Sequence, residues 1–217
     1  MVDVTLSTTS YSVLGYLAVR PWSAYELTKQ MGRTFHHFWP RAESGIYREV
    51  KRLVDASLAT AEGETVGRRA RTRYDITAEG RDRLAAWLAE PRSNGFLEAE
   101  GLVRVLFADH GSKDSLQQTL GAMADDARAR GAAMVELLRR YGAEQGDFPR
   151  RTHINLLIAS FITDFSVMVD EWASWSSALV DTWPDVDERD PDEAILALAR
   201  DLAAQTGRRL DLDAPTS

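Results

Sequence analysis

The 217-residue sequence contains no cysteine, which excludes disulfide bonds, thiolate metal sites and cysteine nucleophiles. Histidine is scarce, and none of the four residues has the His-x-x-x-His spacing that binds a metal on a helix. The sequence also lacks a Gly-x-Ser-x-Gly motif and a phosphate-binding glycine loop. We therefore expect no enzyme activity, no metal site and no cofactor. The histidines are His36, His37, His110 and His153.

Long apolar runs are missing as well. No stretch of eighteen uninterrupted apolar residues occurs, so we expect no membrane span. The first residues, Met-Val-Asp-Val-Thr-Leu-Ser, lack the charged and apolar regions of a signal peptide. These features favour a cytoplasmic location.

The net charge of −7 is unusual for a protein that binds nucleic acid, but the charge is unevenly distributed. Residues 1–90 carry +2, and residues 91–217 carry −9. Salt screens electrostatic interactions beyond roughly 10 Å, so phosphate binding depends on the local charge at the contact surface. The first part of the chain therefore remains compatible with a DNA partner.

The most informative segment spans residues 41–73. Ile46, Val50 and Leu53 are spaced by four and three residues and share one face of a predicted helix. The rest of that helix is polar or cationic and can face an external partner. These other positions are Ser44, Gly45, Tyr47, Arg48, Lys51 and Arg52.

A predicted hairpin follows the helix. Residues 58–62 and 72–76 alternate in polarity like paired strands, and residues 67–73 form the predicted turn between them. The turn contains four arginines and no acidic residue. A basic helix followed by a basic hairpin is typical of a winged helix-turn-helix and indicates DNA as the partner. The arginines are Arg68, Arg69, Arg71 and Arg73.

Other signals complete this predicted domain. A first helix is expected from about residue 8 to residue 19, and Ser23 with Glu26 forms a capping box for the second helix. Thr77 is the expected N-cap of a fourth helix, which Pro91 ends. We therefore assign residues 1–90 to a winged helix-turn-helix DNA-binding domain and residues 91–95 to a hinge.

In a winged helix-turn-helix the third helix enters the major groove, which directs Ser44, Tyr47, Arg48 and Lys51 to the DNA. Arg48 and Lys51 can contact guanine edges or phosphates, and the residue types leave both roles open. Tyr47 either contacts a phosphate or packs on the domain core. The acidic neighbours in this helix, Glu43 and Glu49, could pair with its cations and weaken the basic surface. The wing arginines would approach the DNA backbone or the minor groove.

Several segments follow one another in a consistent order within residues 10–90. They are Leu14-Gly-Tyr-Leu, Pro21-Trp-Ser-Ala-Tyr-Glu-Leu27, Phe38-Trp-Pro40, Gly45-Ile-Tyr-Arg-Glu-Val-Lys-Arg-Leu53 and Arg71-Thr-Arg-Tyr-Asp-Ile-Thr77. Together these segments resemble the PadR-type transcriptional regulators. Two positions depart from the family pattern: Ala24 stands where a glycine is common, and Arg48 stands where a proline is usual. The resemblance implies a dimeric, ligand-responsive repressor whose carboxyl-terminal helices make the dimer.

The second part of the chain is predicted to be helical. Helices are expected over residues 98–109, 113–141 and 150–181, and a last helix is expected to begin at Asp190 as its N-cap. We assign residues 96–206 to a helical dimerisation and effector domain with long helices and residues 207–217 to a flexible tail. The fold class is therefore mainly α.

The third of these helices carries an apolar seam with steps of three or four residues, which is typical of coiled-coil contacts. Its length exceeds what one small protein needs, so it favours a homodimer. Two-fold symmetry would then separate two recognition helices by roughly 34 Å, on double-stranded DNA with a pseudo-palindromic operator. The seam consists of Ile154, Leu157, Phe161, Phe165, Met168, Trp172, Trp175 and Leu179.

Four aromatic residues of this seam, Phe161, Phe165, Trp172 and Trp175, are candidates for binding a flat apolar effector. The alternative for the same residues is packing in the core and the dimer. The sequence as a whole thus predicts a dimeric DNA-binding transcriptional regulator, a repressor released by a small aromatic or other ligand. The alternative is a protein-interaction adaptor that uses the winged domain without binding DNA.

Overall fold

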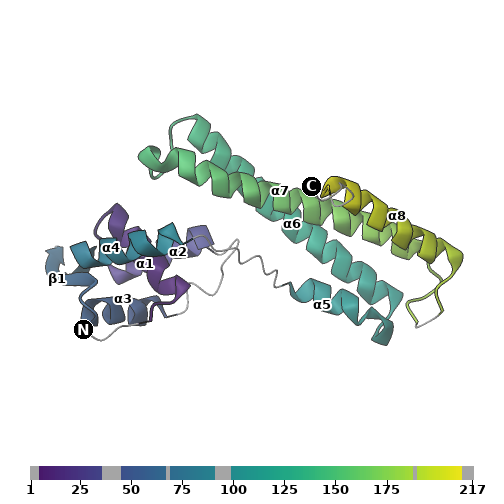
Figure 1. Ribbon diagram of the computed structural model, residues 1–217, viewed down its shortest axis with the longest axis horizontal. Coiled ribbons are helices and arrows are strands. Elements are labelled where there is room, and N and C mark those ends of the chain that lie inside the picture. Colours follow the sequence, from purple (N-terminus) through teal and green to yellow (C-terminus); the bar gives the residue numbers. More distant parts are fainter. Residues whose placement is uncertain (1–4, 36–44, 67–68, 91–98, 188–189, 212–217) are drawn as a thin grey trace, which may run out of the picture. The chain divides into compact units, whose positions relative to one another are not determined.

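The computed structural model describes residues 5–35, 45–66, 69–90, 99–187 and 190–211. Within these residues the chain is mainly helical and has one two-stranded antiparallel ribbon, as the predicted fold class requires (Figure 1). The elements are α1 (Thr8–Val19), α2 (Ala24–Phe35), α3 (Ile46–Asp55), β1 (Ala59–Val66), β2 (Arg69–Ile76), α4 (Ala78–Ala89), α5 (Glu100–Leu106), α6 (Lys113–Gly142), α7 (Thr152–Asp181) and α8 (Glu193–Arg209).

Two compact units make up the chain. The first contains Met1–Glu98 and Arg130–Phe165, and the second contains Ala99–Ala129 and Ser166–Ser217. The long helices α6 and α7 therefore contribute residues to both units. The elements of the winged helix-turn-helix, α1 to α4 with the ribbon, all belong to the first unit.

The core of the first unit lies between α1, α2, α3 and the base of the ribbon. The three apolar residues predicted to share one face of α3 are all buried in it. Because one face of each short helix is apolar, the helices hide these faces together and leave their polar faces outside. The buried residues are Val13, Leu14, Leu17, Trp22, Leu27, Met31, Ile46, Val50, Leu53, Leu58, Ala59 and Ile76.

Side-chain caps begin three helices of this unit. At α1 the amide of Ser10 donates to the Ser7 hydroxyl at 3.1 Å, and the amide of Ser7 donates back to the Ser10 hydroxyl at 3.1 Å. The predicted capping box at α2 is confirmed, because the Ser23 amide donates to Glu26 Oε2 at 2.9 Å. Thr77 caps α4 as predicted, through a 3.0 Å bond from a backbone amide to its hydroxyl.

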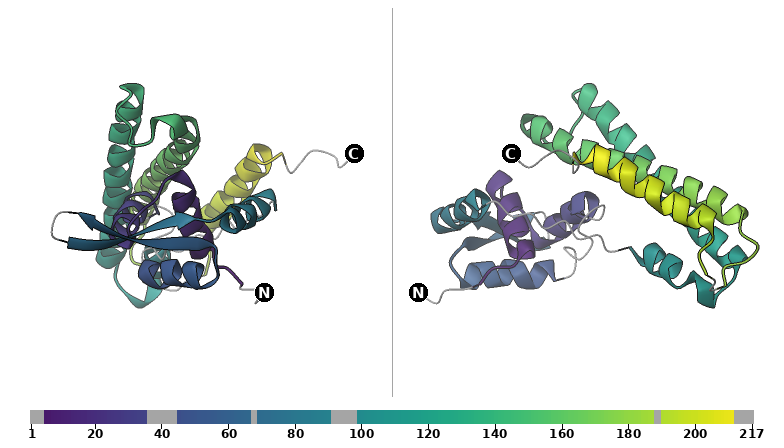
Figure 2. Two further views of the ribbon diagram at one scale, coloured as in Figure 1. Left: turned by 90° about the vertical axis from the view of Figure 1, so that its left-hand side faces the viewer. Right: turned by 45° about the vertical axis from the view of Figure 1, so that its right-hand side comes forward.

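The wing is the antiparallel pair β1–β2, which pairs Ala59 with Ile76 at its base. The α1–α2 connection joins this base, since Trp22 and Tyr74 exchange two backbone hydrogen bonds of 3.0 and 2.8 Å. The left view of Figure 2 shows the ribbon projecting past α3. The base of the wing is thus fixed to the helices, and its far part extends away from them.

Gly80 lets α4 approach the start of the wing closely. A Cβ atom on Gly80 would lie 2.2 Å from the carbonyl oxygen of Leu58. No side chain fits at that distance, so only glycine allows this contact between the first turn of α4 and the chain that enters β1.

The predicted strand boundaries were wrong. Residues 67–73 were expected to form the turn, but β2 begins at Arg69 and β1 extends to Val66. Opposite charges across the ribbon account for part of the extension, because Glu64 faces Arg71 in the strand register. The predicted turn was based on the arginines of β2 alone, without the acidic residues that face them from β1.

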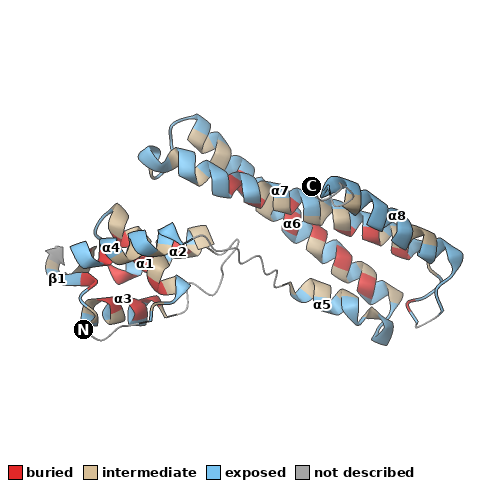
Figure 3. Ribbon diagram, viewed as in Figure 1, coloured by how far each residue is buried: buried red, intermediate tan, exposed pale blue. Residues whose placement is uncertain are grey.

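The helix α7 buries small side chains. Its buried positions recur at steps of three, four or seven residues and, apart from Ile162 and Val180, are all alanine or serine. Small side chains allow neighbouring helices to approach closely. Figure 3 shows these buried positions as short red segments between exposed ones. They are Ala159, Ile162, Ser166, Ala173, Ser176 and Val180.

Within the first unit, the turn between α6 and α7 contacts the winged core. Phe148 packs against this core, with its ring centroid 6.2 Å from that of Trp22. Asp147 Oδ2 lies 3.8 Å from Arg33 Nη1 on α2. The turn therefore covers part of the α1–α2 surface with one aromatic and one acidic side chain.

The carboxyl-terminal helix differs from its prediction at both ends. Its N-cap is Asp192, whose carboxylate accepts the amide of Ile195 at 2.9 Å, so the predicted cap at Asp190 is wrong. Asp192 reaches the amide three residues ahead as an N-cap should, whereas Asp190 lies outside the helix. The helix also continues to Arg209, beyond the predicted start of the tail at residue 207.

One described helix, Pro149–Asp181, is long and apolar enough to cross a membrane by length and composition. The search for uninterrupted apolar runs missed it because polar residues interrupt the apolar ones. Near its middle, Asp170 Oδ1 lies 2.8 Å from Arg128 Nη2 of α6. Such an ion pair is costly inside a bilayer, so length and composition alone are weak evidence that this helix spans a membrane.

Candidate nucleic-acid interface

The outer surface of α3 presents the predicted groove-facing residues. Tyr47 is 61% exposed, and Arg48 and Lys51 are also exposed. The alternative in which Tyr47 packs on the core is therefore wrong. These three side chains lie on adjacent turns of one helix, with one hydroxyl and two cations available to a partner. The remaining predicted residue of this group, Ser44, lies outside the described residues.

Gly45 acts through its backbone. It is the N-cap of α3 and has a φ of 88°, in the left-handed region that favours glycine. A Cβ atom at this position would lie 3.0 Å from Nη2 of Arg48. Glycine thus permits both the turn into α3 and the position of the Arg48 side chain above it.

Arg52, although predicted to contact DNA, has partners within the domain. Its guanidinium donates to the carbonyl oxygen of Thr5 and lies 3.6 Å from Glu49 Oε2. It therefore ties the segment before α1 to α3. Among the predicted cations of α3, Arg48 and Lys51 are the ones that face outward without these contacts to Thr5 and Glu49.

Pairing of Glu43 or Glu49 with Arg48 or Lys51 was one alternative from the sequence. Glu43 lies outside the described residues, and the structure places Glu49 on the inner side of α3. Its carboxylate is nearly buried and accepts a 2.7 Å hydrogen bond from the hydroxyl of Ser10 in α1. Sequence analysis had not given Ser10 any role. A polar residue within a helical face that is otherwise apolar was the available signal.

The wing arginines fall into two groups. Arg71 Nη2 donates to both carboxylate oxygens of Glu26 at 3.1 Å, and Arg71 Nε lies 3.8 Å from Glu64 Oε2. Arg73 donates to the carbonyl oxygen of Pro21 at 2.9 Å and lies 3.5 Å from Glu64. These two arginines therefore have partners inside the domain.

The other two wing arginines are Arg68 and Arg69. Arg69 begins β2, and its backbone pairs with Val66. Arg68 lies outside the described residues. The prediction that all four wing arginines contact DNA therefore has two outcomes. Arg71 and Arg73 have partners within the domain, and for Arg68 and Arg69 the DNA contact stays a prediction.

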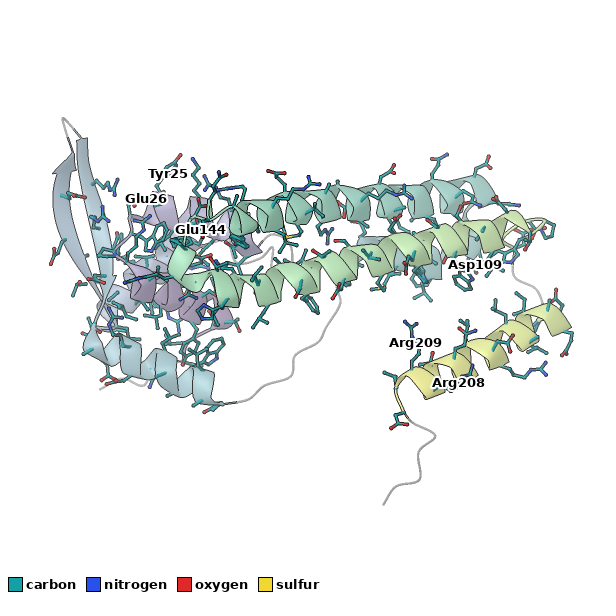
Figure 4. All side chains as sticks on the ribbon, turned by 90° about the horizontal axis from the view of Figure 1, so that it is seen from above. Tyr25, Glu26, Asp109, Glu144, Arg208 and Arg209 are labelled. Atoms are coloured by element: carbon teal, nitrogen blue, oxygen red, sulfur yellow. The ribbon has the colours of Figure 1, made fainter. Side chains whose placement is uncertain are left out.

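Glu26 is the most connected carboxylate of the wing base. It accepts 2.9 Å bonds from both the amide and the hydroxyl of Ser23, in addition to those from Arg71. Figure 4 labels Glu26 among the helices beside the ribbon. Burial raises the pKa of Glu26, but the Ser23 hydrogen bonds and the charges of Arg71 and Arg20 outweigh it and hold the pKa below its usual value. Glu26 therefore remains ionised at neutral pH.

The large apolar residues of α7 lie mostly on its exposed side. Leu157 is 66% exposed and Phe161 is 64% exposed. Separately, α8 contains no buried residue and exposes large apolar residues of its own (Figure 3). We call the six of these α7 residues that share one side of the helix the α7 apolar face: Ile154, Leu157, Ile158, Phe161, Met168 and Trp175.

The predicted effector residues lie along α7 and do not meet in one cavity. The rings of Phe161 and Phe165 stack with centroids 6.5 Å apart, and Trp175 is exposed. Trp172 packs on the apolar cluster of the second unit. Beside that cluster is a cavity of about 360 Å³, and none of the four residues lines it. Its walls include Val105, Asp109, Leu116, Leu120, Val180 and Trp183.

No group of three or more histidine, aspartate or glutamate residues that could hold a metal ion occurs among the described residues. In the described part of the first unit, the neighbouring polar side chains form ion pairs and helix caps. The features of the chain that suit a macromolecular partner are therefore the α3 surface with the adjacent wing, and the α7 apolar face.

Comparisons with known proteins agree with this organisation. Residues 13–86 match the model of a family described as the transcriptional regulator PadR-like family. A curated protein from Mycobacterium tuberculosis, described as a probable transcriptional regulator, is 33% identical over 86 residues. The matched part is 38% of this chain and 44% of that protein, so the chain spans less than half the length of this relative.

Solved structures are similar over a larger part of the chain. The Bacillus subtilis PadR in complex with operator DNA has a TM-score of 0.70 and 19% identity, and covers 80% of this chain and 99% of its own. The same protein in complex with p-coumaric acid has a TM-score of 0.63 and 18% identity, and covers 82% of this chain and all of its own. At these identities the likeness shows a shared fold.

Proposed function

We propose that this chain, which belongs to the PadR-like family of transcriptional regulators through residues 13–86, binds operator DNA as a homodimer. Proteins of this family regulate transcription and are not enzymes. The proposal rests on the two faces of α3. One face buries three apolar residues, and the other exposes Tyr47, Arg48 and Lys51 beside the projecting wing. This arrangement suits a helix in the major groove and a wing along the backbone.

In this proposal residues 1–90 form the DNA-binding domain, residues 91–95 a hinge and residues 96–206 the dimerisation domain. Arg48 and Lys51 supply base or phosphate contacts, and Tyr47 supplies a phosphate contact through its hydroxyl. Arg68 and Arg69 supply contacts from the far part of the wing. Acidic residues concentrate in the second part of the chain, so the first part faces the duplex.

Selection of bound sequences from a random duplex pool, followed by measurement of affinity at several salt concentrations, tests DNA binding. We expect an enriched pseudo-palindrome and an affinity that falls steeply with salt. Failure to bind any duplex at low salt would overturn the proposal and favour a protein-interaction adaptor.

The α7 apolar face supports a homodimer. Its large side chains are exposed in the single chain while small side chains fill the inner side of α7. A contiguous surface of exposed apolar residues is unfavourable in water and marks an interface. A second copy of the chain would supply the same face, as a two-fold axis requires. Sedimentation analysis tests this proposal, and a monomer at micromolar concentration would contradict it.

We further propose that a small ligand releases the protein from DNA, so that it acts as a repressor. A related solved structure contains p-coumaric acid, and the second unit of this chain has an apolar cavity of about 360 Å³. Ligand cavities commonly measure roughly 300–1,000 Å³. The four aromatic residues of α7 remain the other predicted effector site.

Titration with p-coumaric acid as the probe distinguishes these two sites. Binding in the cavity should change the fluorescence of Trp183, so Trp183→Phe should abolish the signal. Binding at the α7 aromatic residues should instead depend on Trp175 and survive that substitution. DNA release measured in the same titration tests the repressor role, and binding without release would contradict it.

A further inference from the structure

In addition to the apolar contacts at its base, the wing is held to the helices by polar contacts with one short segment of chain. Residues Pro21 to Glu26 contact β2 at three successive points, through the Pro21 carbonyl, the Trp22 backbone and the Glu26 carboxylate. Their partners on β2 are Arg73, Tyr74 and Arg71. Of these three contacts, that between Glu26 and Arg71 lies farthest from the base of the ribbon. It is therefore the one that best controls the direction of the projecting part.

Glu26 is itself held firmly. Its Oε2 closes the capping box of α2 with Ser23, and both carboxylate oxygens accept from Arg71 Nη2. A carboxylate in the first turn of a helix is also favoured by the helix dipole. Because its position is set by α2, Glu26 transmits the orientation of the helix-turn-helix to the wing.

We propose that Glu26 is a positioning residue for DNA binding, which fixes the wing through Arg71 and makes Arg71 a structural residue, not a phosphate contact. This inference rests on the proposed function, because the wing is assumed to approach DNA. A wing that moved freely about its base would lose this freedom when it bound DNA, and the entropic cost would lower the affinity. Because Glu26 already holds Arg71 in the free protein, part of this cost does not arise on binding.

The proposal reverses the electrostatic expectation for one variant. If Glu26 acted on DNA only through its negative charge, Glu26→Gln would reduce repulsion of phosphates and strengthen binding. If Glu26 positions the wing, the same substitution weakens binding, although it makes the protein less acidic. Glutamine keeps an oxygen that can accept from Ser23, so the α2 cap is preserved.

The test measures duplex affinity against salt concentration by fluorescence anisotropy, with the best sequence from the random pool as the probe. The variants are Glu26→Gln, Arg71→Gln and their double mutant, and Glu79→Gln on α4 is the charge-matched control. We expect each single variant to weaken binding by about threefold to tenfold, the double mutant to be no weaker than the singles, and the salt slope to stay unchanged. Glu79→Gln should bind as tightly as the wild type or slightly tighter.

Arg71→Lys provides a second criterion. Lysine keeps the charge that a phosphate contact needs but lacks the planar guanidinium, whose Nη2 contacts Glu26 while its Nε lies 3.8 Å from Glu64 Oε2. We expect Arg71→Lys to lose affinity as Arg71→Gln does. The proposal is overturned if Glu26→Gln binds as tightly as the wild type or tighter. It is also overturned if Arg71→Gln lowers the salt slope by about one while Arg71→Lys retains it.

Hydrogen exchange of the free protein separates this inference from the DNA-binding proposal. Glu26→Gln and Arg71→Gln should speed amide exchange in β2, while exchange in α1 and α3 stays at the wild-type rate. Unchanged exchange in β2 would refute the positioning role whether or not the protein binds DNA. Accelerated exchange in a protein that binds no duplex would refute the DNA-binding proposal and leave the wing contact established.

Discussion

The hydroxyl of Ser10 in α1 donates a 2.7 Å hydrogen bond to the carboxylate of Glu49 in α3, and both residues are buried. This bond links the first helix directly to the helix that carries the proposed DNA contacts. Arg52 lies 3.6 Å from the same carboxylate and provides a compensating charge. A buried carboxylate needs such partners because it has lost its contact with water.

Ser10→Ala should therefore destabilise the first unit. The substitution leaves Glu49 without its buried donor, which costs about 1–3 kcal/mol in the free energy of unfolding. It also removes the Ser10 half of the capping box with Ser7. Thermal and urea denaturation measure the change. Ser12→Ala, whose hydroxyl contacts only the Thr8 carbonyl on an exposed turn, is the matched control and should change stability by less than about 0.5 kcal/mol.

Neighbouring cations of α3 should respond differently to substitution. Lys51 is exposed, so Lys51→Gln should lower the salt slope of DNA binding by about one and leave folding stability unchanged. Arg52 instead contacts the Thr5 carbonyl and Glu49, so Arg52→Gln should lower the melting temperature with a smaller effect on the slope. A larger slope change in Arg52→Gln than in Lys51→Gln would reverse these assignments.

Sequence periodicity predicted most of the winged domain because its helices are short and have one buried face each. The caps at Ser23 and Thr77 were predictable, since the residue types and spacing of a cap are local. The hairpin boundaries were not, because strand pairing depends on which residues face each other across the ribbon. Glu64 and Arg71 are seven residues apart in sequence, and their pairing appears only in the register.

The candidate site was predictable in outline but not in its detailed roles. Tyr47, Arg48 and Lys51 are exposed as expected, because an apolar helical face fixes where the opposite face lies. Arg71 pairs with the Glu26 carboxylate of α2, and Arg52 donates to the Thr5 carbonyl before α1. Composition cannot show that residues so distant in sequence meet. An arginine that appears free in the sequence can therefore be a structural residue.

The seam of α7 was also predictable only in part. Its large residues follow a helical period, but periodicity does not show which of two faces the chain itself covers. Small residues such as Ala173 and Ser176, which contribute little to a pattern of large apolar residues, form the covered face. The large residues, Phe161 among them, remain exposed. Because both faces of such a helix can pack, only the structure shows which face the chain itself covers.

Leu157→Glu and Phe161→Glu should each shift the protein from dimer to monomer. Both side chains are already exposed in the single chain, so a charge there should not disturb its folding, yet it would be buried in a dimer interface. Sedimentation velocity measures the shift, and circular dichroism verifies the helix content. Gln118→Glu adds the same charge to an exposed position of α6 and should leave the dimer intact. Variants that remain fully dimeric would place the interface elsewhere.

The contribution of Glu26 to stability should depend on pH. Its pKa in the folded protein is lowered from the ordinary value of 4.5 by the Ser23 hydrogen bonds and the nearby arginine charges, which outweigh the opposing effect of burial. A carboxyl with a lowered folded pKa stabilises the fold fully above its unfolded pKa and loses that contribution as pH falls through the folded value.

We therefore expect the wild type to be more stable than Glu26→Gln at neutral pH, with the difference constant down to about pH 5. Below that pH the difference should shrink as the unfolded carboxyl, and then the folded one, takes up a proton. Urea denaturation of both proteins between pH 3 and pH 7 measures this difference, and Glu79→Gln serves as the control on α4. If the stability difference between the two proteins grew on acidification, the pKa of Glu26 would be raised in the folded protein. The attraction between Glu26 and Arg71 would then be too weak to position the wing.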